Sequence, residues 1–159
     1  SIASATANAS RPFDSIYVDE PETNCEFGVS YIAENLPQHT LSFYECDGRA
    51  QVWLSKVVKE PDLSALHYKN DGEYQVVDHL FLGTLSNQEF IDPPRCTLRN
   101  SKETIQIVGL YRRLPKNKMV FTHGNGGLLQ AWEVNPNTKR FELMPKHQLA
   151  AIICKADGE

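Results

Sequence analysis

The fold of this chain is decided by residues 25–48, which read CEFGVSYIAENLPQHTLSFYECDG. Apolar side chains alternate with polar or small ones over 25–31 and again over 41–46. An alternation with period two puts every second side chain on one face of a strand, so each run predicts a β-strand with one buried face. The dipeptide Asp47-Gly48 follows, and it favours the positive φ angles of a two-residue hairpin turn. The stretch therefore predicts antiparallel strands connected by tight turns.

The rest of the chain continues this pattern, with short apolar segments separated by clusters of Gly, Pro, Asn and Asp. Such turn clusters at intervals of about eight to twelve residues are typical of all-β folds. A parallel sheet would require strands that alternate with helices, and the sequence shows no such alternation. We expect an all-β fold, mainly an antiparallel meander, arranged as a sandwich, an open barrel or a propeller-like sheet. Strands are predicted at 74–82, 103–111, 119–122, 128–134, 140–144 and 149–154.

Residues 50–58 fit two structures. Ala50, Trp53, Leu54, Val57 and Val58 fall at helical spacing, whereas the preceding hairpin signal favours a strand. We interpret this stretch as a strand. A single helical turn is predicted at 61–66, and the whole chain is expected to hold at most one or two short helices.

Length and charge restrict the class of protein. A chain of 159 residues fits one domain with its own core. We expect a flexible tail over residues 1–11, which are small and polar, and a single β-rich domain over 12–159. The net charge of −4 disfavours nucleic acid as a partner, because phosphates attract a concentrated basic face. No apolar run has the length of a membrane span.

The four cysteines indicate the compartment. Their number is even and they lack the close spacing of zinc or redox motifs, so two disulfides are predicted. Three pairings are possible, and we favour Cys25–Cys46 with Cys96–Cys154. The alternative is a cytosolic protein with four reduced cysteines. The chain also starts with small residues and no methionine, as a mature exported protein would, so we expect a periplasmic or extracellular location.

No motif for a reaction is present. The histidines are not paired at metal-ligand spacing, and a nucleophile elbow, a P-loop and a dinucleotide-binding turn are all missing from the sequence. We therefore predict no catalytic residue, no metal and no cofactor, and a protein that is not an enzyme. The histidines are His39, His67, His79, His123 and His147.

The segment with the clearest features for binding is Met119–Met144. It holds a glycine-rich turn, which the flanking strand signals predict to be a hairpin, and small residues at a turn tip let a backbone approach a partner closely. A tryptophan follows on the return strand, and aromatic anchors are enriched in interfaces. The alternative is a structural hairpin with this tryptophan in the core. The predicted partner-binding residues are His123, Gly124, Asn125, Gly126, Gly127 and Trp132.

A basic stretch precedes this segment. It contains Arg112, Arg113, Lys116 and Lys118 around a predicted turn. Such a cluster is usually a solvated loop, and in some proteins it contacts an acidic partner.

Residues 120–129 read VFTHGNGGLL and residues 131–134 read AWEV. With the cysteines and the β-meander, this segment resembles the periplasmic immunity proteins that neutralise peptidoglycan-amidase effectors of type VI secretion. The resemblance is architectural and covers the C-terminal half. It implies that a loop of small polar residues plugs the catalytic groove of an effector. No inhibitory serine can be assigned in this chain, because the tip carries Asn125.

These features lead to one function and two alternatives. The leading hypothesis is a periplasmic or secreted inhibitor, or immunity protein, that binds a secreted toxic enzyme. One alternative is a small secreted hydrolase acting on cell wall or polysaccharide, with His123 and an acidic residue as acid and base. The other is a carbohydrate-binding or envelope interaction module that uses Trp53 and Trp132.

Overall fold

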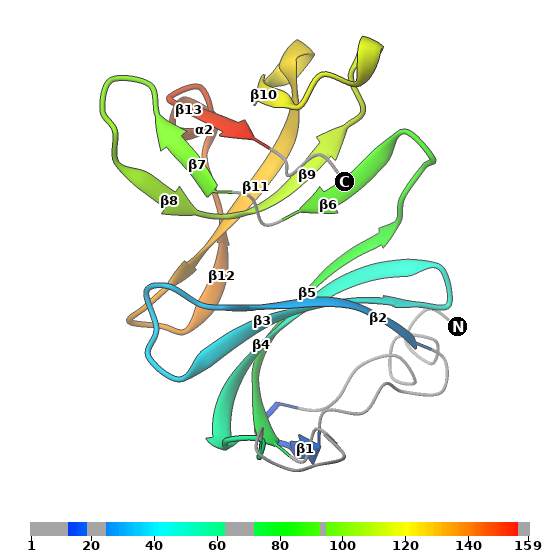
Figure 1. The fold of residues 1–159 in the computed structure, drawn as a ribbon, viewed down its shortest axis with the longest axis vertical. Helices are drawn as coiled ribbons and strands as arrows, with labels where there is room; N and C mark the ends of the chain where they lie inside the picture. The colour runs from blue at the N-terminus through cyan, green and yellow to red at the C-terminus, as the bar shows by residue number, and fades with distance from the viewer. Residues whose placement is uncertain (1–12, 19–24, 63–71, 93–94, 156–159) are drawn as a thin grey trace. The chain divides into compact units, whose positions relative to one another are not determined.

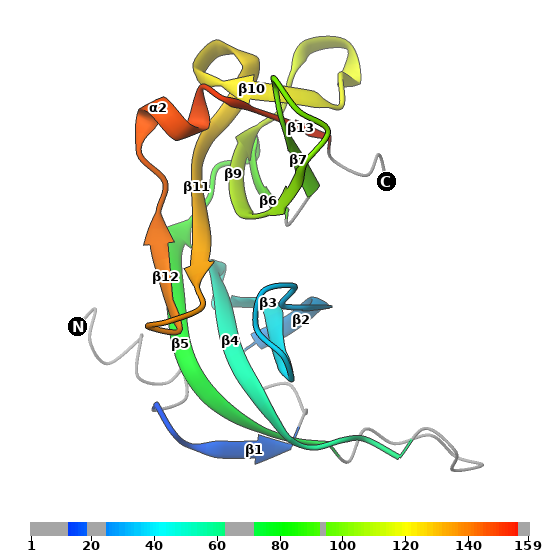
Figure 2. The same ribbon diagram turned by 90° about the vertical axis from the view of Figure 1, so that its left-hand side faces the viewer.

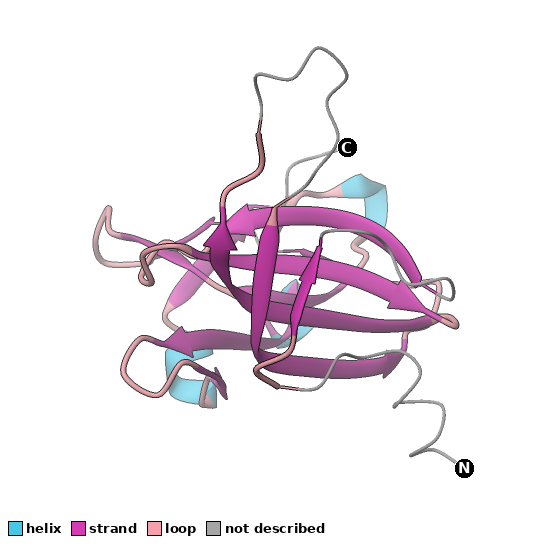
Figure 3. Ribbon diagram, turned by 90° about the horizontal axis from the view of Figure 1, so that it is seen from below, coloured by secondary structure: helices cyan, strands magenta, loops and turns pink. Residues whose placement is uncertain are grey.

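The structure, a computed structural model, describes residues 13–18, 25–62, 72–92 and 95–155. Strands make up most of these residues, and the helical pieces among them are short (Figures 1 and 3). The all-β prediction is therefore confirmed. The chain divides into two compact units. The prediction of one domain over 12–159 stays a prediction, and the predicted tail, residues 1–11, lies outside the described residues.

The first unit contains the described residues up to Thr84 together with Pro136–Arg140. Its sheet has five antiparallel strands in the order β1-β5-β4-β3-β2. Strands that follow one another from β2 to β5 are neighbours, which is the predicted meander, and β4 and β5 run side by side as long curved strands (Figure 2). The strands are β1 (Ile16–Val18), β2 (Cys25–Ile32), β3 (His39–Cys46), β4 (Arg49–Lys59) and β5 (Glu73–Thr84).

Two predictions for this unit are confirmed. Asp47 and Gly48 have φ angles of 53° and 74°, as a tight hairpin between β3 and β4 requires, and Cys46 pairs with Arg49 across the turn. The ambiguous stretch 50–58 lies within β4, so the strand interpretation is correct. The helical turn predicted at 61–66 falls mostly outside the described residues.

The core of the first unit is built from aromatic side chains that carry polar groups. The Tyr17 hydroxyl lies 2.8 Å from the Ser55 hydroxyl, and the Trp53 indole N–H donates to the Gln51 amide oxygen at 2.5 Å. Both bonds satisfy polar groups that would otherwise be buried without partners. The Trp53 ring also packs against Tyr44, with 4.4 Å between ring centroids.

The second unit contains Leu85–Asn135 and the described residues from Phe141 onward. Its strands lie in the order β6-β9-β11-β10-β13-β7-β8, with β12 paired to β11. The order differs from the order along the chain, so this sheet is not a simple meander. The strands are β6 (Glu89–Asp92), β7 (Arg95–Leu98), β8 (Thr104–Gln106), β9 (Val108–Arg112), β10 (Val120–His123), β11 (Gly127–Asn135), β12 (Arg140–Leu143) and β13 (Ile152–Lys155).

Two expectations for this unit need correction. The strand predicted over 103–111 is divided into β8 and β9 at Ile107, whose side chain is buried. The strand predicted from residue 149 starts at Ile152, because the helix α2 (Lys146–Leu149) precedes it. Two 3-10 turns, η1 (Pro115–Asn117) and η2 (Gly124–Gly126), complete the unit.

The core of the second unit centres on three stacked or edge-on rings. Phe90 stacks on Tyr111 with 5.2 Å between centroids, and Phe121 packs edge-on against Tyr111 at 4.9 Å. Burial of the Tyr111 hydroxyl raises its pKa, so this group stays neutral. Gly109 lies beside this ring, where a side chain would collide with it: a Cβ there would be 2.5 Å from Tyr111 ring atoms.

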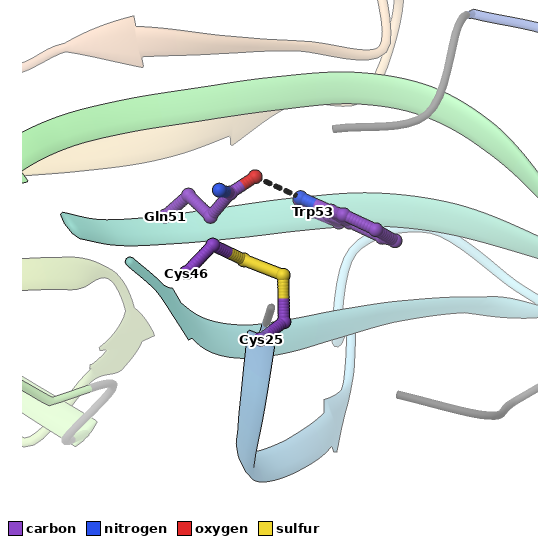
Figure 4. The surroundings of a disulfide bond; sticks show 4 residues. All are labelled: Cys25, Cys46, Gln51 and Trp53. Carbon is purple, nitrogen blue, oxygen red and sulfur yellow. Dashed lines mark hydrogen bonds between the residues drawn. A yellow bond between two sulfur atoms is a disulfide. The ribbon is translucent and has the colours of Figure 1, made fainter. Parts of the chain in front are cut away.

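Each unit has one disulfide, and the favoured pairing is confirmed. Cys25 in β2 is bonded to Cys46 in β3, and Cys96 in β7 is bonded to Cys154 in β13. In both cases the two cysteines are directly opposite each other in the strand register. Figure 4 shows the first bond next to the Gln51–Trp53 hydrogen bond.

Candidate partner-binding surface

The predicted glycine-rich turn is present, but it is not a hairpin. β10 and β11 pair in parallel, with Thr122 opposite Gly127 and His123 opposite Leu128. The chain between them makes one turn of 3-10 helix, η2, and then enters β11 in the same direction. Gly127 ends this turn in the left-handed region, with φ 93°. The sequence pattern shows two strands around a turn, and it does not reveal their relative direction.

Two of the glycines are required by close packing. A Cβ at Gly126 would lie 1.9 Å from the Thr122 Oγ1 atom. A Cβ at Gly127 would lie 2.8 Å from a ring carbon of Phe121 and 2.9 Å from the Arg112 carbonyl oxygen. These positions are therefore fixed by the fold of the turn, independently of any partner.

The other two residues of the turn are open to solvent. Gly124 and Asn125 are exposed, and a Cβ at Gly124 would meet no atom within 4 Å. His123 and Gly126 are half-buried, and Gly127 is buried. The part of the turn that another molecule can reach is thus the Gly124-Asn125 tip.

Trp132 is not part of this tip. It lies in β11 opposite Val108 and is half-buried. It lies five positions after Gly127, which corresponds to about 16 Å along a strand. The predicted binding residues therefore form two places, the turn His123–Gly127 and a separate position on β11.

The basic stretch that the sequence placed before this segment adjoins the tip. The Arg112 guanidinium donates to the Asn125 carbonyl oxygen at 3.4 Å. Figures 1 and 2 both show η1 and η2 at the same end of the second unit. Sequence reasoning treated the two turns separately, because only the pairing of β9 with β11 brings them together.

A second cluster of aromatic side chains lies in the first unit. His79 is stacked on Phe13 with 5.0 Å between ring centroids, and Trp53 and Phe81 pack around it. Burial lowers the pKa of His79 from its ordinary value of 6.5, and the neighbouring carboxylate of Asp78 opposes this effect. The cluster favours a neutral imidazole and is part of the packing of this unit.

The structure bears on the residues named for the two alternative functions. Trp53 is 1% exposed and its N–H is bonded to Gln51, so it is a core residue that cannot stack on a sugar. No group of three or more metal-ligating side chains occurs in the described part of the chain. His67 lies outside the described residues.

No protein family, curated protein or solved structure matches this chain. Among the helices of the described segments, none has the length and apolar character needed to cross a membrane.

Proposed function

We propose that this chain is a periplasmic or secreted binding protein that inhibits a secreted toxic enzyme. In this proposal the turn His123–Gly127 enters the catalytic groove of the enzyme. The proposal is carried by the Gly124-Asn125 tip, which is exposed while the two glycines that follow it, Gly126 and Gly127, are closely packed. A backbone that is both accessible and fixed can enter a narrow groove with little loss of conformational entropy.

Two further observations support this proposal. Both disulfides fit a compartment outside the reducing cytoplasm, where such an inhibitor would meet a secreted enzyme. The resemblance to periplasmic immunity proteins supplies the kind of partner, an enzyme that degrades peptidoglycan. A partner that also contacted Trp132 would have to extend about 16 Å along β11 beyond Gly127.

The test adds bulk at the one non-glycine residue of the exposed tip. Asn125→Trp should weaken binding strongly, because an indole at the tip would clash with the walls of a groove that admits only a small side chain; a penalty of about 2 kcal/mol is roughly thirtyfold in affinity. Asn125→Ala should weaken binding less, since it leaves the backbone accessible. Binding is measured by calorimetric titration against the purified secreted enzyme encoded by the adjacent gene. Gly126 is not suitable for this test, because any side chain there collides with Thr122.

The matched control is Asn100→Trp, the same change at an exposed asparagine in the turn between β7 and β8. It should leave affinity unchanged. If Asn125→Trp binds as tightly as the wild type, the turn is not the contact. If the enzyme does not bind the wild type, the inhibitor proposal is wrong.

A further inference from the structure

Positive charge is concentrated at one end of the second unit. Arg112, Arg113, Lys116 and Lys118 fall within seven residues, and all four side chains are exposed. The whole chain nevertheless carries a net charge of −4. The four residues lie within and around η1, and one of them, Arg112, contacts the Gly124-Asn125 tip; we call the four residues the basic tip.

The two arginines of the basic tip are held in place by backbone carbonyls. Arg112 donates to the carbonyl oxygen of Asn125, and the Arg113 Nε donates to the carbonyl oxygen of Asn87, both at 3.4 Å. The Arg113 guanidinium also lies over the Phe90 ring, 5.1 Å from its centroid. A guanidinium held in this way has lost part of its rotamer freedom before a partner arrives, which reduces the entropic cost of binding.

The two lysines are presented by an unusual turn. Lys116 and Asn117 have φ angles of 61° and 53°, and the Lys118 N–H closes the turn on the Pro115 carbonyl oxygen at 3.5 Å. Two successive non-glycine residues in the left-handed region are uncommon, and such conformations are found more often at sites with a function. The uncommon backbone conformation therefore occurs at the same turn as the positive charges.

One carboxylate lies opposite this surface in the strand register. Glu89 pairs with Arg112 across β6 and β9, and the Ser86 N–H donates to its carboxylate at 3.0 Å. That hydrogen bond lowers the pKa of Glu89 and keeps it charged. Among the described residues, none of the four cations forms an ion pair with a carboxylate. The basic tip therefore keeps an excess of positive charge.

We propose that the basic tip binds a carboxylate-rich concave surface on a protein partner. This inference rests on the proposed function, in which the neighbouring turn enters the groove of an enzyme. It adds that the surface around that groove is rich in carboxylates. Fixed guanidinium groups suit carboxylates because they present paired donors in one plane. Complementary charge would also accelerate association.

A carboxylate-rich protein segment fits better than a nucleic acid or an anionic membrane. Those partners would meet much of a chain whose net charge is −4, and four cations are fewer than the six to ten phosphate contacts that strong nucleic-acid binding typically uses. A concave protein surface would meet only the two turns.

The first experiment needs no knowledge of the partner. A fluorescent deca-glutamate peptide is titrated at low ionic strength with the wild type, with Lys116→Glu/Lys118→Glu, and with the control Arg99→Glu/Lys102→Glu. Both double variants change the net charge equally, and the control lies at another exposed turn of the same unit. We expect about a tenfold loss of affinity for the first variant and less than twofold for the control.

Three outcomes would overturn the inference: no binding by the wild type, equal losses in both variants, or tighter binding of single-stranded DNA than of the peptide. Circular dichroism of each variant verifies that the exposed substitutions leave the fold intact.

A second arm separates this inference from the proposed function. The enzyme encoded by the adjacent gene is titrated with the same variants at low and high ionic strength. Equal affinity of the wild type and Lys116→Glu/Lys118→Glu for that enzyme would overturn the inference and leave the inhibitor proposal standing. Peptide binding at the basic tip without enzyme binding would leave the inference standing and reject the inhibitor proposal.

Discussion

The two units use the same materials in different ways. The sheet of the first unit is antiparallel, and the sheet of the second is antiparallel except for the pair β10 and β11. Each unit has an aromatic core and one disulfide between directly paired strands. The first unit builds its sheet mainly from strands that follow one another along the chain. The second unit pairs strands that are far apart, such as β7 with β13.

This difference has an energetic consequence. Pairing distant strands requires closing longer loops, and the entropic cost of closure rises with loop length. The second unit should therefore depend more on its disulfide and on the tight packing of its turns. The same unit carries both exposed turns of the candidate surface, so its stability and its presentation of the tip are linked.

The largest expected effect comes from removing each disulfide in turn. The Cys96–Cys154 bond spans 58 residues and the Cys25–Cys46 bond spans 21. Replacing both cysteines of a bond with alanine should lower the free energy of unfolding by about 4 kcal/mol for the first and about 3 kcal/mol for the second. Urea denaturation of the full chain measures both. A greater loss for Cys25→Ala/Cys46→Ala would contradict the idea that the second unit depends more on closure.

The next effect compares glycines of positive φ in the two units. Gly48→Ala in the first unit should lower the free energy of unfolding by about 1 kcal/mol. The new Cβ would contact no other atom within 4 Å, so the only cost is that of an alanine in the left-handed region. Gly127→Ala in the second unit should cost about 3 kcal/mol, since the Cβ also collides with Phe121 and a backbone carbonyl. Thermal and urea unfolding of the two variants give the values. Equal losses would show that the turn η2 relaxes easily.

The smallest effect is a dependence on pH that belongs to the first unit. The pKa of His79 is lowered in the folded chain, so the unfolded chain binds more protons below the ordinary value of 6.5. Stability from this group is therefore complete above that value and is lost as the pH falls below it. The charged groups near the imidazole are Asp78 and its partner Arg140, which lies 3.3 Å from Asp78 and over the Phe13 ring.

This dependence is measured as the free energy of unfolding across the range from pH 7.5 to 5, with His79→Phe as the comparison. The variant keeps a ring in the aromatic cluster and removes the titrating group, so part of the slope should disappear. An unchanged slope would mean that other groups determine the acid sensitivity.

The sequence predicted local structure well and long-range structure poorly. The Asp47-Gly48 turn and the strand over 50–58 were predicted correctly because turn chemistry and side-chain alternation are properties of adjacent residues. The favoured disulfide pairing was also correct. The parallel pairing of β10 with β11 and the division at Ile107 were not predicted, because strand direction and sheet order depend on residues distant in the chain.

The candidate surface shows the same division. Its glycine-rich turn and its basic stretch were both visible as local composition. The contact between Arg112 and Asn125, and the collision that makes Gly126 a structural residue, arise only when β9, β10 and β11 are assembled. The exposed tip is consequently smaller than the sequence pattern suggested.

The positions of the cysteines also make disulfide formation depend on correct strand register. Each disulfide joins residues that are directly opposite in register, Cys25 with Cys46 and Cys96 with Cys154. A slip of one residue in either pair would turn one cysteine to the opposite face of the sheet, where it could not reach its partner. Each disulfide can therefore form only when its two strands are in the native register. A molecule with both disulfides has β2 correctly aligned with β3 and β7 correctly aligned with β13.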